Sequence, residues 1–136
     1  MSFELRPHTA DIEIRARAAC VGGVFDTVAA GLAAATADTE ASPVDSFTID
    51  LTADTLEHLL YDFLDQLIYE RDVRGVFPVE TRSTILDLEC QYNLQSTVNY
   101  VPLTEVTGRE IKAVTFADMR VEEINGEWEI NVVFDV

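Results

Sequence analysis

The residues best suited to chemistry stand near the two ends of this sequence. The segment His8-Thr9-Ala10-Asp11 precedes an alternating stretch, and the last two residues are Asp135 and Val136. At the end of the chain, the Asp135 side chain and the carboxylate of Val136 would place two anionic groups side by side. Calcium and magnesium accept such ligands, so we expect half of a hard-cation site here, with Asp11 as a third carboxylate. The alternative is that Thr9 and Asp11 only cap local backbone donors.

Lys112 raises a similar question. It is the only lysine in the chain, and the other basic residues are arginines. A single retained lysine suggests a role that needs a compact ammonium group rather than a planar guanidinium. Retention by chance is the alternative.

Common catalytic motifs are missing from the sequence. It has no phosphate-binding glycine loop, no Gly-x-Ser-x-Gly elbow and no His-Glu-x-x-His pair. His8 and His58 are the only histidines, and we expect His58 to lie on the surface of a helix rather than to bind a ligand. Cys20 and Cys90 lack disulfide or zinc spacing, and we expect both thiols to be buried. An active site in this chain would therefore have to use His8, the carboxylates or Lys112.

Hydrophobic periodicity predicts the elements that position these residues. Alternation predicts strands over residues 12–18, 47–52, 76–80, 84–91, 111–116, 121–124 and 127–136, with Asn125-Gly126 as a two-residue hairpin turn. Helical spacing predicts helices over 24–35 and 56–69, and Asp54 and Glu57 have capping-box spacing before the second. Residues 93–109 read as irregular and polar. The pattern predicts a single α+β domain over residues 1–136, with two helices packed on an antiparallel sheet.

Composition narrows the classes of function. The 136 residues carry 25 acidic and nine basic side chains, a net charge of −16, which repels phosphate and argues against direct nucleic-acid binding. An acidic shell over a core rich in aromatic and β-branched residues is typical of a protein that works in high salt, as in a halophile. No apolar run approaches the roughly 20 residues of a membrane helix, and the first residues do not resemble a signal peptide. We therefore expect a soluble, cytoplasmic protein.

Four segments of the chain together resemble the archease family. The first, residues 8–14, is similar to the opening motif HTADI-x-I, and residues 56–69 resemble the central leucine-rich helix. Residues 111–115 match the signature IKAVT, and residues 132–136 match VxFDV. The four segments occur in order along nearly the whole chain. The resemblance implies an α+β fold with a bifurcated antiparallel β-sheet and two packed α-helices.

The resemblance also implies a function. Archeases are accessory proteins, not enzymes, that activate the RtcB-type RNA ligase of tRNA splicing by promoting its guanylylation and multiple turnover. The family binds a divalent metal, typically calcium, and its ligands carry over to Asp11, Asp135 and Val136. The motif lysine that matters for ligase activation falls on Lys112, and His8 would orient Asp11.

Two other functions stay open at this point. The first is a general chaperone or modulator of nucleic-acid-processing proteins, acting through a sheet face. The second is a metal-dependent enzyme on small phosphorylated substrates, with Asp11 and Asp135 as ligands. The scarcity of histidines and the lack of a general-base constellation argue against the enzyme.

Overall fold

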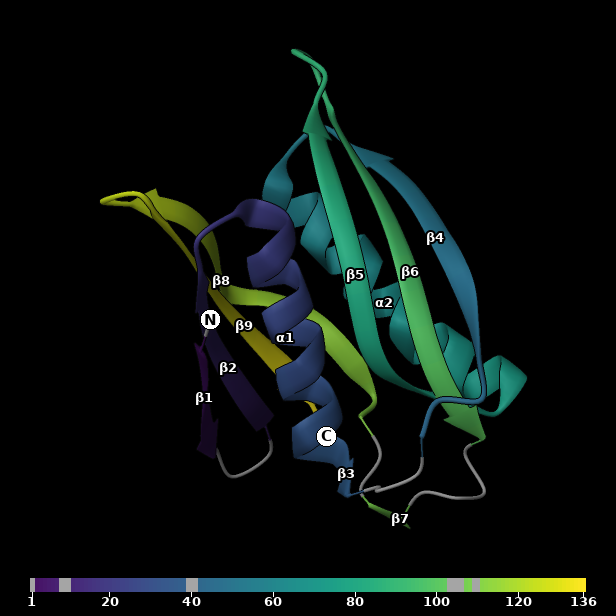
Figure 1. The fold of residues 1–136 in the computed structure, drawn as a ribbon. Coiled ribbons are helices and arrows are strands. Elements are labelled where there is room, and N and C mark those ends of the chain that lie inside the picture. Colours follow the sequence, from purple (N-terminus) through teal and green to yellow (C-terminus); the bar gives the residue numbers. More distant parts are fainter. Residues whose placement is uncertain (1, 8–10, 39–41, 103–106, 109–110) are drawn as a thin grey trace.

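The computed structural model of the chain describes residues 2–7, 11–38, 42–102, 107–108 and 111–136 (Figure 1). The elements follow in the order β1 (Ser2–Pro7), β2 (Asp11–Ala18), α1 (Val21–Thr36), β3 (Ala37–Asp38), β4 (Asp45–Ala53), α2 (Leu56–Arg74), β5 (Val76–Asp87), β6 (Tyr92–Pro102), β7 (Thr107–Gly108), β8 (Ala113–Ile124) and β9 (Glu127–Asp135). Both predicted helices are therefore confirmed, and each is longer than its apolar pattern indicated.

The strands form two main sheets and one small pair. The larger sheet has the order β1-β2-β9-β8, the smaller has the order β4-β6-β5, and β3 pairs with β7. All pairings are antiparallel. In Figure 1, α1 lies over the four-stranded sheet, while α2 lies behind the three-stranded one. This is the single α+β domain that the sequence predicts, with its strands divided between two separate sheets.

Helix α1 fills the space between the two sheets. It contacts β2 on one side and β5 on the other. A Cβ atom on Gly22 would lie 2.4 Å from the carbonyl oxygen of Ser83, so only glycine lets the helix approach β5 this closely. Farther along, Phe25 is fully buried and packs against Phe63 of α2, with ring centroids 6.1 Å apart. The core is thus continuous between the helices and both sheets.

Helix α2 has well-defined ends. Thr55 is the N-cap and accepts a hydrogen bond from the backbone N–H of His58, so the predicted cap at Asp54 is wrong by one residue. At the other end, Gly75 adopts φ 65° and its N–H donates to the carbonyl of Arg71, a left-handed C-cap that suits glycine. Among the described residues, neither helix is long and apolar enough to cross a membrane.

The prediction of an irregular stretch over residues 93–109 is wrong for its first part. Residues Tyr92–Pro102 form β6, the central strand of the three-stranded sheet. Its inward positions include Leu94, Ser96 and Val98, and the buried Ser96 hydroxyl accepts a hydrogen bond from Ser83 Oγ at 2.9 Å. A polar residue in the middle of the buried face masked the alternation. Of the remainder, residues 103–106 and 109–110 lie outside the described part of the chain.

Two pairs of predicted strands merge into longer strands with bulges. The predicted strands 76–80 and 84–91 both fall in β5, whose register shifts between Pro78 and Glu80, but β5 ends at Asp87, so the prediction is wrong for residues 88–91. The predicted strands 111–116 and 121–124 likewise fall in β8, which begins only at Ala113 and has a register shift between Thr115 and Arg120. The hairpin turn at Asn125-Gly126 is confirmed, since both residues have positive φ (52° and 83°), as a two-residue turn of this kind requires.

The expectation of two buried thiols is also wrong, because Cys20 and Cys90 are both exposed. Cys20 precedes α1, where its Sγ accepts a hydrogen bond from the N–H of Gly23 at 3.3 Å. Its position before the first helical turn places it at the surface, although cysteine usually favours the interior.

Candidate functional site

Strand pairing brings the first and last predicted site residues together. Asp11 begins β2 and Asp135 ends β9, and the two are direct partners across the antiparallel pair. Asp135 is also the partner of Ala113 on β8, on its other side. Asp11, Lys112, Asp135 and Val136 therefore lie at one end of the four-stranded sheet, and we call this group the tip.

Both aspartates lie on the outer face of that sheet. Their neighbours Ile12 and Phe134 are 5% and 0% exposed and point into the core, and alternate residues of a strand point to opposite faces. Asp11 is half-buried, whereas Asp135 is exposed. Side chains directly opposite on one face have Cβ atoms about 5 Å apart, and like charges in this arrangement destabilise the sheet. A cation bound between the two carboxylates would relieve that repulsion.

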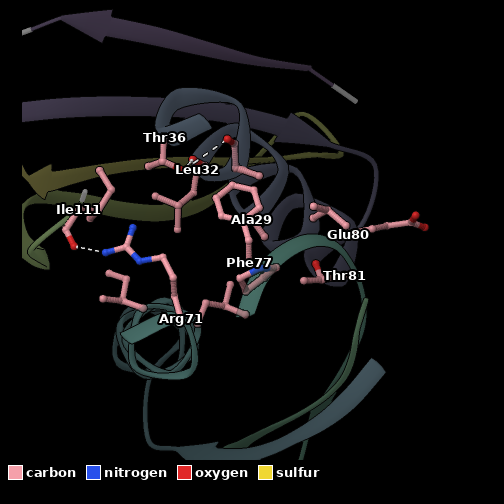
Figure 2. Close-up of a pocket in the computed structure, with 13 residues that line it drawn as sticks. Ala29, Leu32, Thr36, Arg71, Phe77, Glu80, Thr81 and Ile111 are labelled. Atoms are coloured by element: carbon pink, nitrogen blue, oxygen red, sulfur yellow. Dashed lines mark hydrogen bonds between the residues drawn. The ribbon is translucent and has the colours of Figure 1, made fainter. Parts of the chain in front are cut away.

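The peptide group that joins Ile111 to Lys112 is held by two hydrogen bonds. Its N–H donates to the carbonyl oxygen of Asp135 at 2.9 Å, which ties it to the tip. The preceding residue, Ile111, is 1% exposed, and its carbonyl accepts a hydrogen bond from Arg71 Nη2 at 2.7 Å. Figure 2 shows the Arg71 side chain reaching from α2 to this carbonyl. The Lys112 side chain itself is exposed, so a hydrogen-bonded backbone carries an ammonium group at the surface.

Arg71 was not identified from the sequence, although its spacing offered a signal. It stands three residues after Ile68 and four after Leu67, so it continues the buried face of α2. An arginine on such a face needs a buried acceptor for its guanidinium group. The carbonyl of Ile111, 40 positions away in sequence, meets that need.

A cavity beside Arg71 lies between α1, α2 and β5 (Figure 2). Its walls include Ala29, Leu32 and Phe77, and its volume is about 30 Å³. That is room for about one water molecule, far below the roughly 300 Å³ of a small-molecule site. This cavity is therefore a small gap in the packing and not a substrate site.

A wider hollow of about 280 Å³ lies along the four-stranded sheet. Arg15, Arg17 and Arg120 line it together with acidic side chains. Arg17 pairs with Glu129 at 2.6 Å, and Arg15 Nε donates to Asn131 Oδ1 at 3.3 Å. Because the arginines already have polar partners, the hollow has mixed charge and does not attract anions strongly. The sequence did not indicate it, since its arginines come from strands at opposite ends of the chain.

One half-buried carboxylate has a structural role. Asp26 of α1 accepts hydrogen bonds from Thr81 Oγ1 at 2.7 Å and from the N–H of Ser83 at 3.0 Å, which fastens the helix to β5. Burial raises the pKa of Asp26 above its ordinary value, and the hydrogen bonds from Ser83 and Thr81 offset only part of that rise. Asp26 faces a strand and not the tip.

The predicted site residues can now be compared with the structure. It brings Asp11, Asp135, Val136 and Lys112 together, while His8 lies outside the described residues. Within the described part of the chain, no three Asp, Glu, His or Cys side chains form a group that could hold a metal ion. A metal here would have two carboxylate side chains and a main-chain oxygen of Val136. Such hard oxygen donors fit calcium or magnesium, and they do not suit a structural zinc ion.

Comparison with known proteins shows the family. A model of the Archease protein family matches residues 3–136. The chain belongs to the archease family. The archease of Methanosarcina mazei is 33% identical to this family member, over 98% of this chain and 95% of its own length. The archease of Thermococcus gammatolerans is 31% identical over 98% of both chains. A vertebrate archease, from Danio rerio, is 27% identical over 98% of this chain and 85% of its own length.

Two solved structures have the same fold as this chain. The solution structure of protein 1598 from Methanobacterium thermoautotrophicum superposes with a TM-score of 0.83, at 24% identity over 98% of both chains. The crystal structure of a Thermotoga maritima protein, described as an archease and possible chaperone, gives a TM-score of 0.65 at 19% identity over 96% of both chains. The resemblance seen in the four sequence motifs is therefore confirmed at the level of family and fold.

Proposed function

We propose that this archease activates an RtcB-type tRNA-splicing RNA ligase by promoting its guanylylation and its multiple turnover. The observation that supports this role is the pairing of Asp11 with Asp135 beside a backbone-anchored Lys112. Two carboxylates and one ammonium group therefore lie at the same end of the sheet, with Lys112 immediately before β8. A ligase cleft that holds metal and nucleotide presents charges that such a tip can complement.

We propose that the tip binds a divalent cation, calcium in the first instance. Asp11, Asp135 and a main-chain oxygen of Val136 would hold it. When bound, the ion supplies positive charge that neutralises the two facing carboxylates. The chain's own contribution is to hold both carboxylates on one face, because their strands are paired to neighbours on either side. His8 would orient Asp11 from the preceding segment.

Lys112 is the proposed activating group. Its position depends on two hydrogen bonds, one from its own N–H to Asp135 and one from Arg71 to Ile111. Because the backbone is already held, binding of the ammonium group to an anionic group of the ligase or its nucleotide has to order only the Lys112 side chain. Activation requires that the tip bind the guanylylation-competent state of the ligase more tightly than its other states.

A multiple-turnover ligation assay tests this function. The matching ligase would join RNA ends bearing a 2′,3′-cyclic phosphate and a 5′-hydroxyl, with GTP and divalent metal, in the presence of each archease variant. We expect the wild type to stimulate turnover and both Lys112→Ala and Asp135→Asn to lose most of the stimulation. Glu123→Gln, an exposed charge change at the far hairpin, serves as the matched control. Full stimulation by both tip variants would contradict the proposal.

A general chaperone is the second candidate. Several large apolar side chains are exposed, among them Leu86 and Leu88, each at 47%, at the β5–β6 end of the molecule. A chaperone role predicts that the protein suppresses aggregation of unrelated clients and that Lys112→Ala does so equally well. The ligation assay therefore separates the two candidates, because only the activator depends on Lys112.

A further inference from the structure

A group of aromatic side chains lies partly exposed where α2 meets β8. Phe116 of β8 stacks on Tyr61 of α2, with ring centroids 4.2 Å apart and an interplanar angle of 7°. The His58 ring approaches Phe116 edge-on at 6.0 Å. Phe116 is 53% exposed, and the His58 side chain is 61% exposed. The prediction that His58 is a surface residue is confirmed, and we call these three residues the aromatic ledge.

The backbone that presents Phe116 is held by hydrogen bonds. Phe116 lies inside the β8 bulge, where Asp118 adopts φ 53°. Thr115 Oγ1 donates to the carbonyl of Val133 at 3.1 Å and accepts from the N–H of Ala117 at 3.2 Å. These contacts fix the strand on both sides of Phe116. The exposed ring is therefore carried by ordered backbone, as an anchor in a binding surface should be.

Carboxylates border the aromatic ledge. Asp62 Oδ2 lies 3.7 Å from His58 Nε2, and the Asp62 side chain is 37% exposed. Asp65, three residues farther along the same helix, is also exposed. An aromatic face beside a carboxylate is the combination that recognises a guanidinium group, which stacks on the ring and pairs with the acid.

The same helix contains an occupied example of this combination. Arg74 lies over the ring of Phe47, 5.5 Å from its centroid, and its Nε is 2.6 Å from Glu70 Oε2. No arginine or lysine within the described part of the chain lies over Phe116 or Tyr61. One end of α2 thus places an arginine between an aromatic ring and an acid, whereas at the other end the acid, Asp62, lies beside His58 and no arginine of the described residues occupies the aromatic ledge.

We propose that the aromatic ledge and Asp62 form a docking site for an arginine side chain on the surface of the ligase. That the partner is the ligase rests on the proposed function. The net charge of −16 favours a basic protein surface and disfavours both RNA and a second copy of this chain. Phe116 stands four residues after Lys112, roughly 13 Å along an extended chain. One ligase could therefore contact Lys112 and the aromatic ledge at once.

The test measures the archease concentration that gives half-maximal stimulation of ligation. We expect Phe116→Ala to raise it about tenfold and Asp62→Asn to raise it severalfold, both with an unchanged plateau. Phe116→Trp should retain wild-type behaviour, because its ring can still stack. Leu86→Ala, at an equally exposed apolar residue, is the matched control. This change in concentration at constant plateau differs from the loss of plateau expected for Lys112→Ala.

Several results would overturn the proposal. Wild-type concentration dependence in Phe116→Ala and Asp62→Asn, both shown to be folded by circular dichroism, is one of them. A single-stranded RNA that binds the wild type but not Phe116→Ala, or a dimer that this substitution dissociates, would assign the surface to RNA or to a second copy. If the wild type does not stimulate the ligase, the proposed ligase-activating function is wrong, and this result does not decide whether the aromatic ledge binds arginine. The aromatic ledge is then judged by NMR with a diarginine peptide, which must shift the ring signals of Phe116 more than a dilysine peptide does.

Discussion

At the scale of single residues, the central feature is a pair of like charges placed opposite each other. Asp11 and Asp135 are direct cross-strand partners, and such a pair costs stability unless a cation neutralises it. Proteins retain arrangements of this kind mainly where they bind something. If the tip binds a metal, removing one of the two carboxylates should therefore have opposite effects on stability with and without the ion.

Calcium should raise the melting temperature of the wild type and not that of Asp135→Asn. Without metal, the variant should be as stable as the wild type or more stable, because the repulsion with Asp11 is removed. With calcium at about 100 times its Kd, the wild type should gain about 2.7 kcal/mol, a rise of several degrees for a chain of this size. Differential scanning calorimetry with EDTA and with calcium makes the measurement. An equal calcium response in both proteins would rule out the site, and Glu123→Gln is the control.

Asp26 gives a prediction about pH. Burial raises its pKa, so the folded protein holds this proton more tightly than the unfolded chain does. Stability contributed by such a group falls as pH rises from its ordinary pKa through the raised one. The free energy of unfolding of the wild type, minus that of Asp26→Asn, should therefore increase as pH is lowered from 7 toward 4. Urea titrations at each pH measure this difference, and a pH-independent difference would contradict the assignment.

At the scale of elements, the sequence predicted what regular apolar patterns encode. Both helices and the Asn125-Gly126 hairpin were predicted because each carries a local signal: apolar spacing for the helices and a turn that requires positive φ for the hairpin. Strand β6 was missed because the buried Ser96 interrupts its apolar alternation and finds its hydrogen-bond partner on β5. A buried serine is acceptable at this position because Ser83 hydrogen-bonds to it, and the neighbouring sequence of Ser96 does not reveal that partner.

Some residues of the candidate site could be predicted from the sequence and others could not. Asp11, Asp135 and Lys112 could be singled out by residue type and motif, and the pairing of β2 with β9 brought them together. Arg71 and Phe116 were not singled out, because their roles depend on contacts with residues 40 and 55 positions away. No rule of sequence spacing predicts contacts over such distances. The way in which distant residues position the site is therefore visible only in the three-dimensional structure.

Close packing of α1 on β5 gives a prediction about an element. Gly22→Ala would put a methyl group 2.4 Å from the Ser83 carbonyl oxygen, and backbone on both sides prevents relief. We expect a loss of about 2 kcal/mol or more in the free energy of unfolding. Gly23→Ala is the matched control, since its Cβ would meet only side-chain atoms: Ala18 Cβ at 3.5 Å, an ordinary contact, and Cys20 Sγ at 3.1 Å, which can rotate. Chemical denaturation that ranks the two variants equally would refute this packing argument.

At the scale of the whole molecule, two features stand out. Pairing of β2 with β9 joins segments from the two ends of the sequence, so the tip forms only when β2, β9 and β8 are paired. The other feature is the net charge of −16 on 136 residues, which makes the folded chain repel itself at low ionic strength. Function and stability should therefore both depend on the surrounding ions.

The acidic surface predicts stabilisation by salt. Raising potassium chloride from 0.1 M to 2 M shortens the screening distance from about 10 Å to below about 3 Å, which removes most of the self-repulsion. The melting temperature should rise over this range, and most steeply at its lower end. Calorimetry at constant pH makes the comparison, and a melting temperature that is flat or falls with salt would contradict the prediction of a protein adapted to high salt.

The most direct test of the central claim is the guanylylation of the ligase itself. A ligase that has completed one round of ligation would be incubated with radiolabelled GTP and metal, and the label transferred to the protein would be measured. We predict that wild-type archease restores labelling, and that Lys112→Ala and Asp135→Asn do not. Equal labelling with the wild type, with either variant or with no archease would show that the tip does not promote guanylylation.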